Sequence, residues 1–251
     1  MMREASDDAA DATILNGYSW DDLDQTTFAG YRRRFQTAHP GHPTNNYSDD
    51  QFLEAVNGYR KDRDRGTAGI TVAGLLMFGR PAAIRDWRSR HLFDFRVLPK
   101  GIDSAADWDD RYTWEGNLLG AFDTIYPRLV ERLPVPFRLD GPLRVDATPA
   151  HVALREALVN LLVHADYGET LASLVFRMPD AYFFENPGAS RVPDVGYVGG
   201  RHSDPRNPNL VFMFRQIALA EEAGSGVPRI IQAWRELGYR APQWHTGADD
   251  Y

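Results

Sequence analysis

Four polar residues recur along one stretch of the chain: His151, Glu156, Asn160 and His164. On a helix, the last three are spaced by four residues and lie on one face, with His151 close to them. A carboxylate such as Glu156 polarises water, and the amide oxygen of Asn160 suits a hard Mg²⁺ ion beside phosphates. The pair fits nucleotide chemistry, although a lone Glu-x-x-x-Asn is usually an ordinary helix pair. We interpret the two histidines as packing or hydrogen-bonding groups.

Two glycine-containing segments follow this stretch. Asn186-Pro187-Gly188 ends a predicted strand in a sharp turn, where the backbone can approach a ligand closely. Gly224-Ser225-Gly226 opens a predicted helix, and free backbone amides at a helix N-terminus commonly hold phosphates. Taken alone, the second segment is equally consistent with the plain start of a helix.

Local signals predict the elements that position these residues. Thr148 as N-cap and Pro149 at the first helical position begin the helix that carries Glu156. Further patterns predict strands at 171–177 and 181–185 and helices at 210–220 and 226–237. This order predicts an α/β sandwich over 145–245, with helices on one face of a mixed sheet and the Glu156 helix lining a cleft.

The upstream sequence is predicted to be a smaller helical and α/β region. Its expected elements are helices beginning at residue 19 and at 49–57, a polar linker at 61–66, a helix at 71–79, a strand at 91–98, a helix at 112–133 and two short strands within 137–145. We therefore divide the chain into an N-terminal helical segment (1–65), an intermediate α/β region (66–143) and the domain with the motifs (144–251).

Composition narrows the class of protein. The 251 residues are 43% hydrophobic and 25% charged, which is typical of a globular protein. There is no apolar run of 18 residues, the start is acidic and polar, and there is no cysteine, so a membrane span, a secretory signal and disulfides are not expected. These features predict a cytoplasmic protein. The net charge of −7 argues against a nucleic-acid-binding surface for the chain as a whole, and the absence of a Walker A motif argues against a helicase.

The order of motifs resembles that of a known family. His-x4-Glu-x3-Asn-x3-His, then strand-Asn-Pro-Gly, Arg-Asn-Pro and Glu-x-Gly-x-Gly, is similar to the GHKL (Bergerat-type) ATPase domain over about 140–245. More narrowly, it resembles the RecG-like C-terminal, or divergent ATPase-domain, transcriptional regulators. Members of that family commonly place a Schlafen-type AlbA-like DNA-binding domain ahead of this domain and a winged helix behind it. The resemblance is weaker over 20–140.

This resemblance implies roles for individual residues. Glu156 corresponds to the catalytic, water-activating carboxylate and Asn160 to the Mg²⁺ ligand. The nucleotide-binding residues implied are Asn160, Asn186, Gly188, Arg206, Gly224, Ser225 and Gly226. The chain departs from the class pattern because no Asp-x-Gly-x-Gly is present to supply the carboxylate that reads adenine, and the lid has two glycines. We therefore expect weak discrimination between bases and slow hydrolysis.

Two functions compete at this point. The first is a nucleotide-binding regulatory module of a bacterial-type transcriptional regulator, a slow Mg²⁺-dependent ATPase with ATP and Mg²⁺ as cofactors. The alternative is a degenerate, nucleotide-free dimerisation or scaffold domain of a DNA-binding transcription factor. In both cases we expect a homodimer without membrane contact, which reaches DNA through domains not present in this chain. We also expect the chain to be a fragment of a longer protein.

Overall fold

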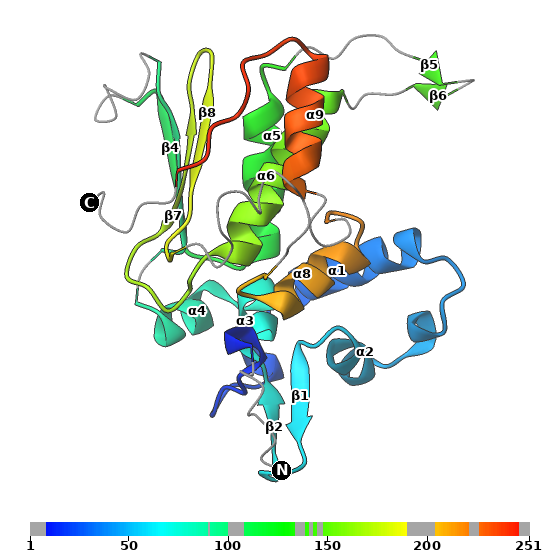
Figure 1. The fold of residues 1–251 in the computed structure, drawn as a ribbon. Helices are drawn as coiled ribbons and strands as arrows, with labels where there is room; N and C mark the ends of the chain where they lie inside the picture. The colour runs from blue at the N-terminus through cyan, green and yellow to red at the C-terminus, as the bar shows by residue number, and fades with distance from the viewer. Residues whose placement is uncertain are drawn as a thin grey trace, which may run out of the picture.

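The computed structural model describes residues 9–89, 91–99, 108–133, 139–140, 143–144, 148–189, 204–220 and 226–245. Its centre is a four-stranded sheet in the order β4-β3-β7-β8, formed by β3 (Phe93–Val97), β4 (Asp110–Trp114), β7 (Ser173–Arg177) and β8 (Tyr182–Glu185). β3 and β7 run parallel, whereas the two outer pairs are antiparallel, so the sheet is mixed. One face is covered by α5 (Leu118–Val130), α6 (Pro149–His164) and α9 (Gly226–Glu236) (Figure 1).

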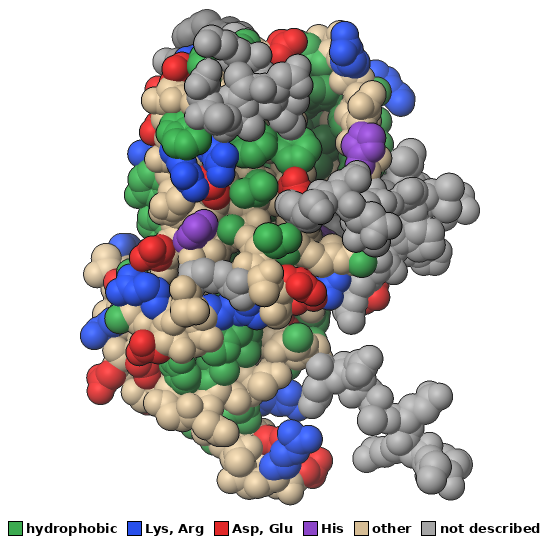
Figure 2. Space-filling view, turned by 90° about the vertical axis from the view of Figure 1, so that its left-hand side faces the viewer, with side chains coloured by type: hydrophobic (Ala, Val, Ile, Leu, Met, Phe, Trp, Pro, Cys, Tyr) green, Lys and Arg blue, Asp and Glu red, His purple; other side chains and the backbone are tan. Residues whose placement is uncertain are grey.

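The two faces of the sheet have different environments. On the helix side, Phe95 and Val175 are fully buried. On the other side, the Asp94 carboxylate accepts hydrogen bonds from Arg96 and Arg111 at 2.7–3.1 Å. Burial alone would raise the pKa of Asp94, but the two guanidinium groups outweigh it and hold that pKa below its usual range. Figure 2 looks onto this side of the molecule, where hydrophobic side chains gather in the upper half beside basic ones.

The N-terminal part of the chain is mainly helical. Its elements are η1 (Ala10–Ala12), η2 (Trp20–Asp22), α1 (Gln25–Ala38), η3 (Pro43–Asn46), α2 (Asp49–Ala55), the hairpin of β1 (Tyr59–Asp62) and β2 (Thr67–Ile70), α3 (Val72–Phe78) and α4 (Pro81–Trp87). Its core is an aromatic cluster with ring centroids 5.1–6.1 Å apart, made of Phe28, Tyr31, Phe35, Phe52 and Phe78. Edge-to-face contacts of this kind add to the free energy gained from burying the rings.

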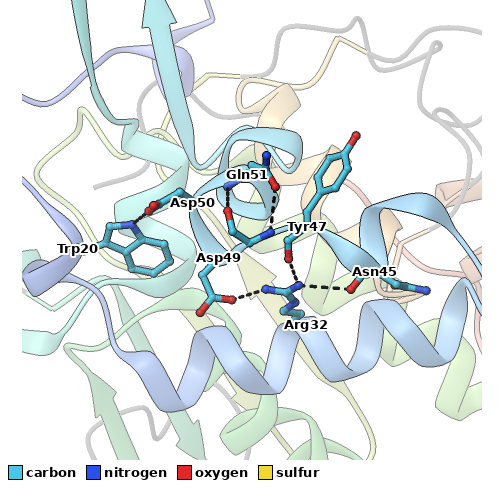
Figure 3. A network of polar contacts seen from close by, with 8 residues as sticks. Trp20, Arg32, Asn45, Tyr47, Asp49, Asp50 and Gln51 are labelled. Atoms are coloured by element: carbon cyan, nitrogen blue, oxygen red, sulfur yellow. Dashed lines mark hydrogen bonds and ion pairs between the residues drawn. The ribbon is translucent and has the colours of Figure 1, made fainter.

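Polar contacts hold α1 against the segment that leads into α2 (Figure 3). The Arg32 guanidinium pairs with the Asp49 carboxylate and donates to the backbone carbonyl of Tyr47. The indole N–H of Trp20 donates to Asp50. Arg32 is therefore used within the N-terminal region and ties its helices together.

The N-terminal region also holds a segment from the far end of the chain. Helix α8 (Pro208–Gln216) lies beside α1 (Figure 1). The Tyr31 hydroxyl donates to the carbonyl of Met213 at 2.8 Å, and the buried Asp11 carboxylate accepts the backbone N–H of Leu210 at 3.0 Å. These contacts fix α8, and with it the residues that enter α8 from the N-terminal side.

The predicted α/β class is confirmed, and most local elements form where expected. The predicted strands within 137–145 are the hairpin of β5 (Leu139–Asp140) and β6 (Leu143–Arg144). Two element predictions were wrong. Residues 110–114 form β4 because they pair with β3, and the helix begins only after the N-cap Asn117. Residues 61–66 belong to the β1–β2 hairpin and its turn instead of a linker.

The central sheet contains strands from both sides of the predicted boundary at residue 143. Strands β3 and β4 precede this residue, and β7 and β8 follow it. Within the described ranges, no helix is long and apolar enough to cross a bilayer.

Candidate functional site

Helix α6 carries the predicted column of polar residues. It begins as predicted: Pro149 occupies the first helical position, and the Thr148 backbone N–H donates to Nδ1 of His151 at 3.2 Å. His151 is therefore a buried capping residue. The apolar face of the helix is buried and includes Leu154, Leu158, Leu161 and Leu162. This burial fixes the helix, and hence the direction in which Glu156 and Asn160 project.

Glu156 and Asn160 lie beneath the first turn of α9, which packs alongside α6 (Figure 1). A methyl group added to Gly226 would lie 2.7 Å from the amide nitrogen of Asn160 and 3.4 Å from Oε2 of Glu156. Glycine allows this close approach of the backbone without displacing the Asn160 or Glu156 side chain. Glu156 is only 2% exposed, and its Oε1 lies 3.9 Å from the Arg155 guanidinium. Three predicted site residues thus meet where α6 and α9 cross.

The electrostatics of this meeting point favour an anion at the start of α9. The N-terminus of a helix carries a partial positive charge and unpaired backbone N–H groups, and the Glu156 carboxylate lies close to it. The positive end of the helix and its backbone N–H groups also suit a phosphate. However, with Gly226 so close to the Asn160 amide, a phosphate cannot enter between them until the first turn of α9 moves away from α6.

A second polar cluster surrounds Asp166, just beyond the C-terminus of α6. Its Oδ2 accepts a hydrogen bond from Nη1 of Arg206 at 2.7 Å, and its Oδ1 accepts the Gly168 backbone N–H at 2.8 Å. Arg206 also donates through Nη2 to the carbonyl of Ala189 at 2.8 Å. Gly188 has a φ of +97°, and a methyl group added there would lie 2.7 Å from Cβ of Asp166. The ion pair therefore holds the turn that follows β8.

The neighbour of Arg206 completes the end of α6. Asn207 is almost fully buried, and its Nδ2 donates to the carbonyls of Val163 and Ala165 at 2.9 and 2.8 Å. The last carbonyls of a helix lack partners within the helix, so this side chain serves as a cap supplied from a distant segment. In the Arg-Asn-Pro motif, Arg206 thus forms an ion pair with Asp166, and Asn207 caps the end of α6.

Cavities lie elsewhere in the molecule. One of about 630 Å³ lies between α1, α5 and the end of α8, lined by residues such as Arg33, Asp123 and Ile217. A much smaller one, of about 10 Å³, lies beside Asp166 and Pro187. Glu156, Asn160 and Gly226 line neither of them. The larger cavity is a groove between helices, with no predicted site residue on its walls.

The predicted site residues fall into two groups in the structure. Glu156, Asn160 and Gly226 meet at the α6–α9 crossing, and Gly188 and Arg206 meet at the Asp166 cluster. Asn186 is half-buried in the turn after β8. Gly224 and Ser225 lie outside the described residues. Sequence reasoning missed Asp166, because its partner Arg206 and the turn at Gly188 come from later parts of the chain.

His164, at the C-terminal end of α6, gives a prediction about pH. It lies four residues after Asn160, and burial lowers its pKa from the usual 6.5; the positive charge of Arg206 lowers it further, against a smaller opposite effect of Asp204. The folded state thus favours the neutral imidazole, and the unfolded state binds the proton more readily. The free energy of unfolding should therefore be constant above about pH 7 and fall as the pH drops through 6.5. His164→Asn should make this fall shallower in urea titrations between pH 7 and 5.5.

The control for this prediction is His245→Asn, since His245 is exposed near the end of the described chain. His151, whose pKa is also lowered by burial, remains in both variants and contributes equally. An identical pH dependence of stability in the His164 and His245 variants would contradict the prediction.

Two family models match parts of the chain. Residues 175–250 match the family described as "Putative ATP-dependent DNA helicase recG C-terminal", and residues 1–94 match a "Domain of unknown function (DUF8451)". The C-terminal part of the chain is thus similar to a RecG-like, ATPase-like domain. That match takes in Gly188, Arg206 and Gly226 but begins after Glu156 and Asn160.

A solved structure shares the fold over most of the chain. The DIP2311 protein from Corynebacterium diphtheriae superimposes with a TM-score of 0.68 at 19% sequence identity. The alignment covers 93% of this chain and 44% of that one, so the chain spans less than half the length of this relative. No curated protein matches the sequence.

Proposed function

We propose that the chain is a nucleotide-binding regulatory module of a DNA-associated protein, with its site along α6. The observation that carries the proposal is the contact of Gly226, at the start of α9, with Asn160 and Glu156. A carboxamide, a carboxylate and a helix N-terminus that begins with glycine are thereby brought together. These are the groups that phosphates and their Mg²⁺ ion require. The RecG-like, ATPase-like match of residues 175–250 supports the same conclusion.

Each group has a separate task in this proposal. Among the described residues, no three His, Asp or Glu side chains are placed to hold a metal by themselves, so Mg²⁺ would be bound jointly by Asn160 and the phosphates. Mg²⁺ would neutralise phosphate charge when bound. Glu156 would orient a water molecule, and the backbone N–H groups at the start of α9 would hold phosphate oxygens. Movement of that turn away from α6 admits the nucleotide and couples its binding to the rest of the chain.

One observation favours the alternative, a nucleotide-free scaffold. Glu156 is nearly fully buried, and α9 lies directly on Asn160. A degenerate domain would keep this arrangement permanently, and its role would be to position attached DNA-binding domains. The two functions differ in whether α9 leaves α6 when a nucleotide is offered.

Thermal unfolding with Mg²⁺ and nucleotide tests the proposal. A ligand at 100 times its Kd stabilises the folded state by about 2.7 kcal/mol, which in a chain of this size raises the melting midpoint by roughly 5–10 °C. Asn160→Ala should abolish the rise because the ion loses its protein ligand. Gln36→Ala, which removes an exposed carboxamide from α1, should leave it intact. If the wild type shows no rise with any nucleotide at millimolar concentration, the scaffold function stands instead.

A further inference from the structure

The three consecutive arginines of α1 have different surroundings. Arg32 is used within the N-terminal region, where it pairs with Asp49. Arg34 reaches across to α5, where Asp123 accepts two hydrogen bonds from its Nη2, at 2.7 and 2.8 Å. Arg33 is exposed, and in the part of the chain that the structure describes no carboxylate forms an ion pair with its guanidinium. Its charge is therefore available to a ligand.

Arg33 lies on the wall of the groove between α1, α5 and the end of α8. The groove has a volume of about 630 Å³, within the range of sites for small molecules. Leu119 and Ile217 line it and are almost fully buried, so they form an apolar floor. Thr26 and Thr37 line it and are exposed, so its rim is polar. A ligand that matches these walls has an apolar body and a polar end.

The space beside Arg33 is open because α1 has a glycine there. A methyl group added to Gly30 would lie 3.8 Å from Nη2 of Arg33, and no other described side chain is within 4 Å of it. Gly30 lies in the middle of a helix, where its backbone does not require glycine and where glycine is unfavourable. What glycine provides at this position is room in the groove, which a longer side chain would fill.

We propose that this groove binds a small amphipathic anion, with its acidic group on Arg33 and its apolar body on Leu119 and Ile217. Charge complementarity carries the choice. Arg34 neutralises the carboxylate of Asp123, so the groove keeps the positive charge of Arg33 in a chain whose net charge is −7. A guanidinium is always protonated, and its planar fork of N–H donors fits the oxygens of a carboxylate or a phosphate. The inference does not depend on the function proposed above.

Calorimetric titration with four probes tests the proposal: 2-naphthoate, 2-naphthyl phosphate, the neutral 2-naphthamide, and acetate. The two naphthyl anions should bind about 10-fold more tightly than 2-naphthamide, because a charged acceptor strengthens the hydrogen bonds from the guanidinium. Acetate carries the charge without an apolar body and should show no binding at millimolar concentration. The ratio between the two naphthyl anions shows whether the site prefers a carboxylate or a phosphate.

Two substitutions separate the charge of the groove from its space. Arg33→Gln should lower the affinity for 2-naphthoate by about 10-fold and leave that for 2-naphthamide unchanged. Gly30→Leu should abolish the binding of both, with an equal or higher melting midpoint, since leucine is the better helix former. The matched controls are Arg63→Gln, at an exposed arginine in the β1–β2 turn, and Gln36→Leu, at an exposed position of α1 outside the groove. Both should bind as the wild type does.

The other outcomes contradict the proposal. Equal binding of 2-naphthoate and 2-naphthamide by the wild type, or wild-type affinity for 2-naphthoate in Arg33→Gln, would show that Arg33 holds no anion. Wild-type binding by Gly30→Leu would place the site outside the groove. If the wild type binds neither anion at millimolar concentration, the inference fails. If Gly30→Leu then also changes the oligomeric state in solution, the groove is an interface between two copies of the chain.

Discussion

Replacing Glu156 by glutamine is expected to lower the rate of nucleotide hydrolysis by about 100-fold or more, while the rise in melting midpoint with Mg²⁺ and nucleotide stays nearly unchanged. Glutamine has the shape of glutamate but cannot take a proton from the attacking water. Glu156 is 2% exposed and its Oε2 lies beside Gly226, so an isosteric neutral side chain fits the same space. Phosphate release and thermal unfolding, measured on the same preparation, separate the two effects.

The matched control is Glu236→Gln, at an exposed glutamate in the last turn of α9 whose carboxylate accepts from Gln232 at 2.8 Å. It changes the net charge by the same amount, far along the helix from Gly226, and should hydrolyse at the wild-type rate. Wild-type turnover in Glu156→Gln would remove this residue from the reaction. Turnover absent from every protein, with binding retained, would identify a nucleotide sensor without hydrolysis.

The elements that form where the sequence predicted them are those fixed by local signals. Thr148 and Pro149 determine the start of α6, and the Ser48 capping box determines the start of α2. The runs of apolar and aromatic residues on either side of the turn at 178–180 likewise located β7 and β8. The error at 112–133 has a non-local cause. Residues 110–114 are a strand only because β3 pairs with them, and that pairing is not encoded in the segment itself.

The candidate site also combines features that local sequence determines with features that depend on distant parts of the chain. The spacing of Glu156 and Asn160 on one helix follows from the sequence, as does a glycine-led start of α9. The sequence does not predict that α9 lies directly over those residues, because this position depends on how two separately predictable helices pack. The role of Asp166 was hidden for a similar reason. Its partner Arg206 and the turn at Gly188 reach it from later parts of the chain.

Gly188→Ala is expected to destabilise the fold by about 2–4 kcal/mol. Two physical effects add at this position. A φ of +97° is unfavourable for any residue with a side chain, and the new methyl group would lie 2.7 Å from Cβ of Asp166. That atom is attached to the backbone and cannot rotate away, so Asp166 or the turn must shift, and the pair with Arg206 is disturbed. Urea unfolding measures the summed loss of stability.

Gly41→Ala separates these two contributions. Gly41 also has a positive φ, +78°, but nothing lies within 4 Å of the position of an added methyl group. It should therefore cost only the backbone term, about 1 kcal/mol. Equal losses of stability in the two variants would mean that the turn after β8 yields freely to the methyl group. In that case the contact between Gly188 and Asp166 does not hold Asp166 rigidly, and the ion pair with Arg206 survives the change.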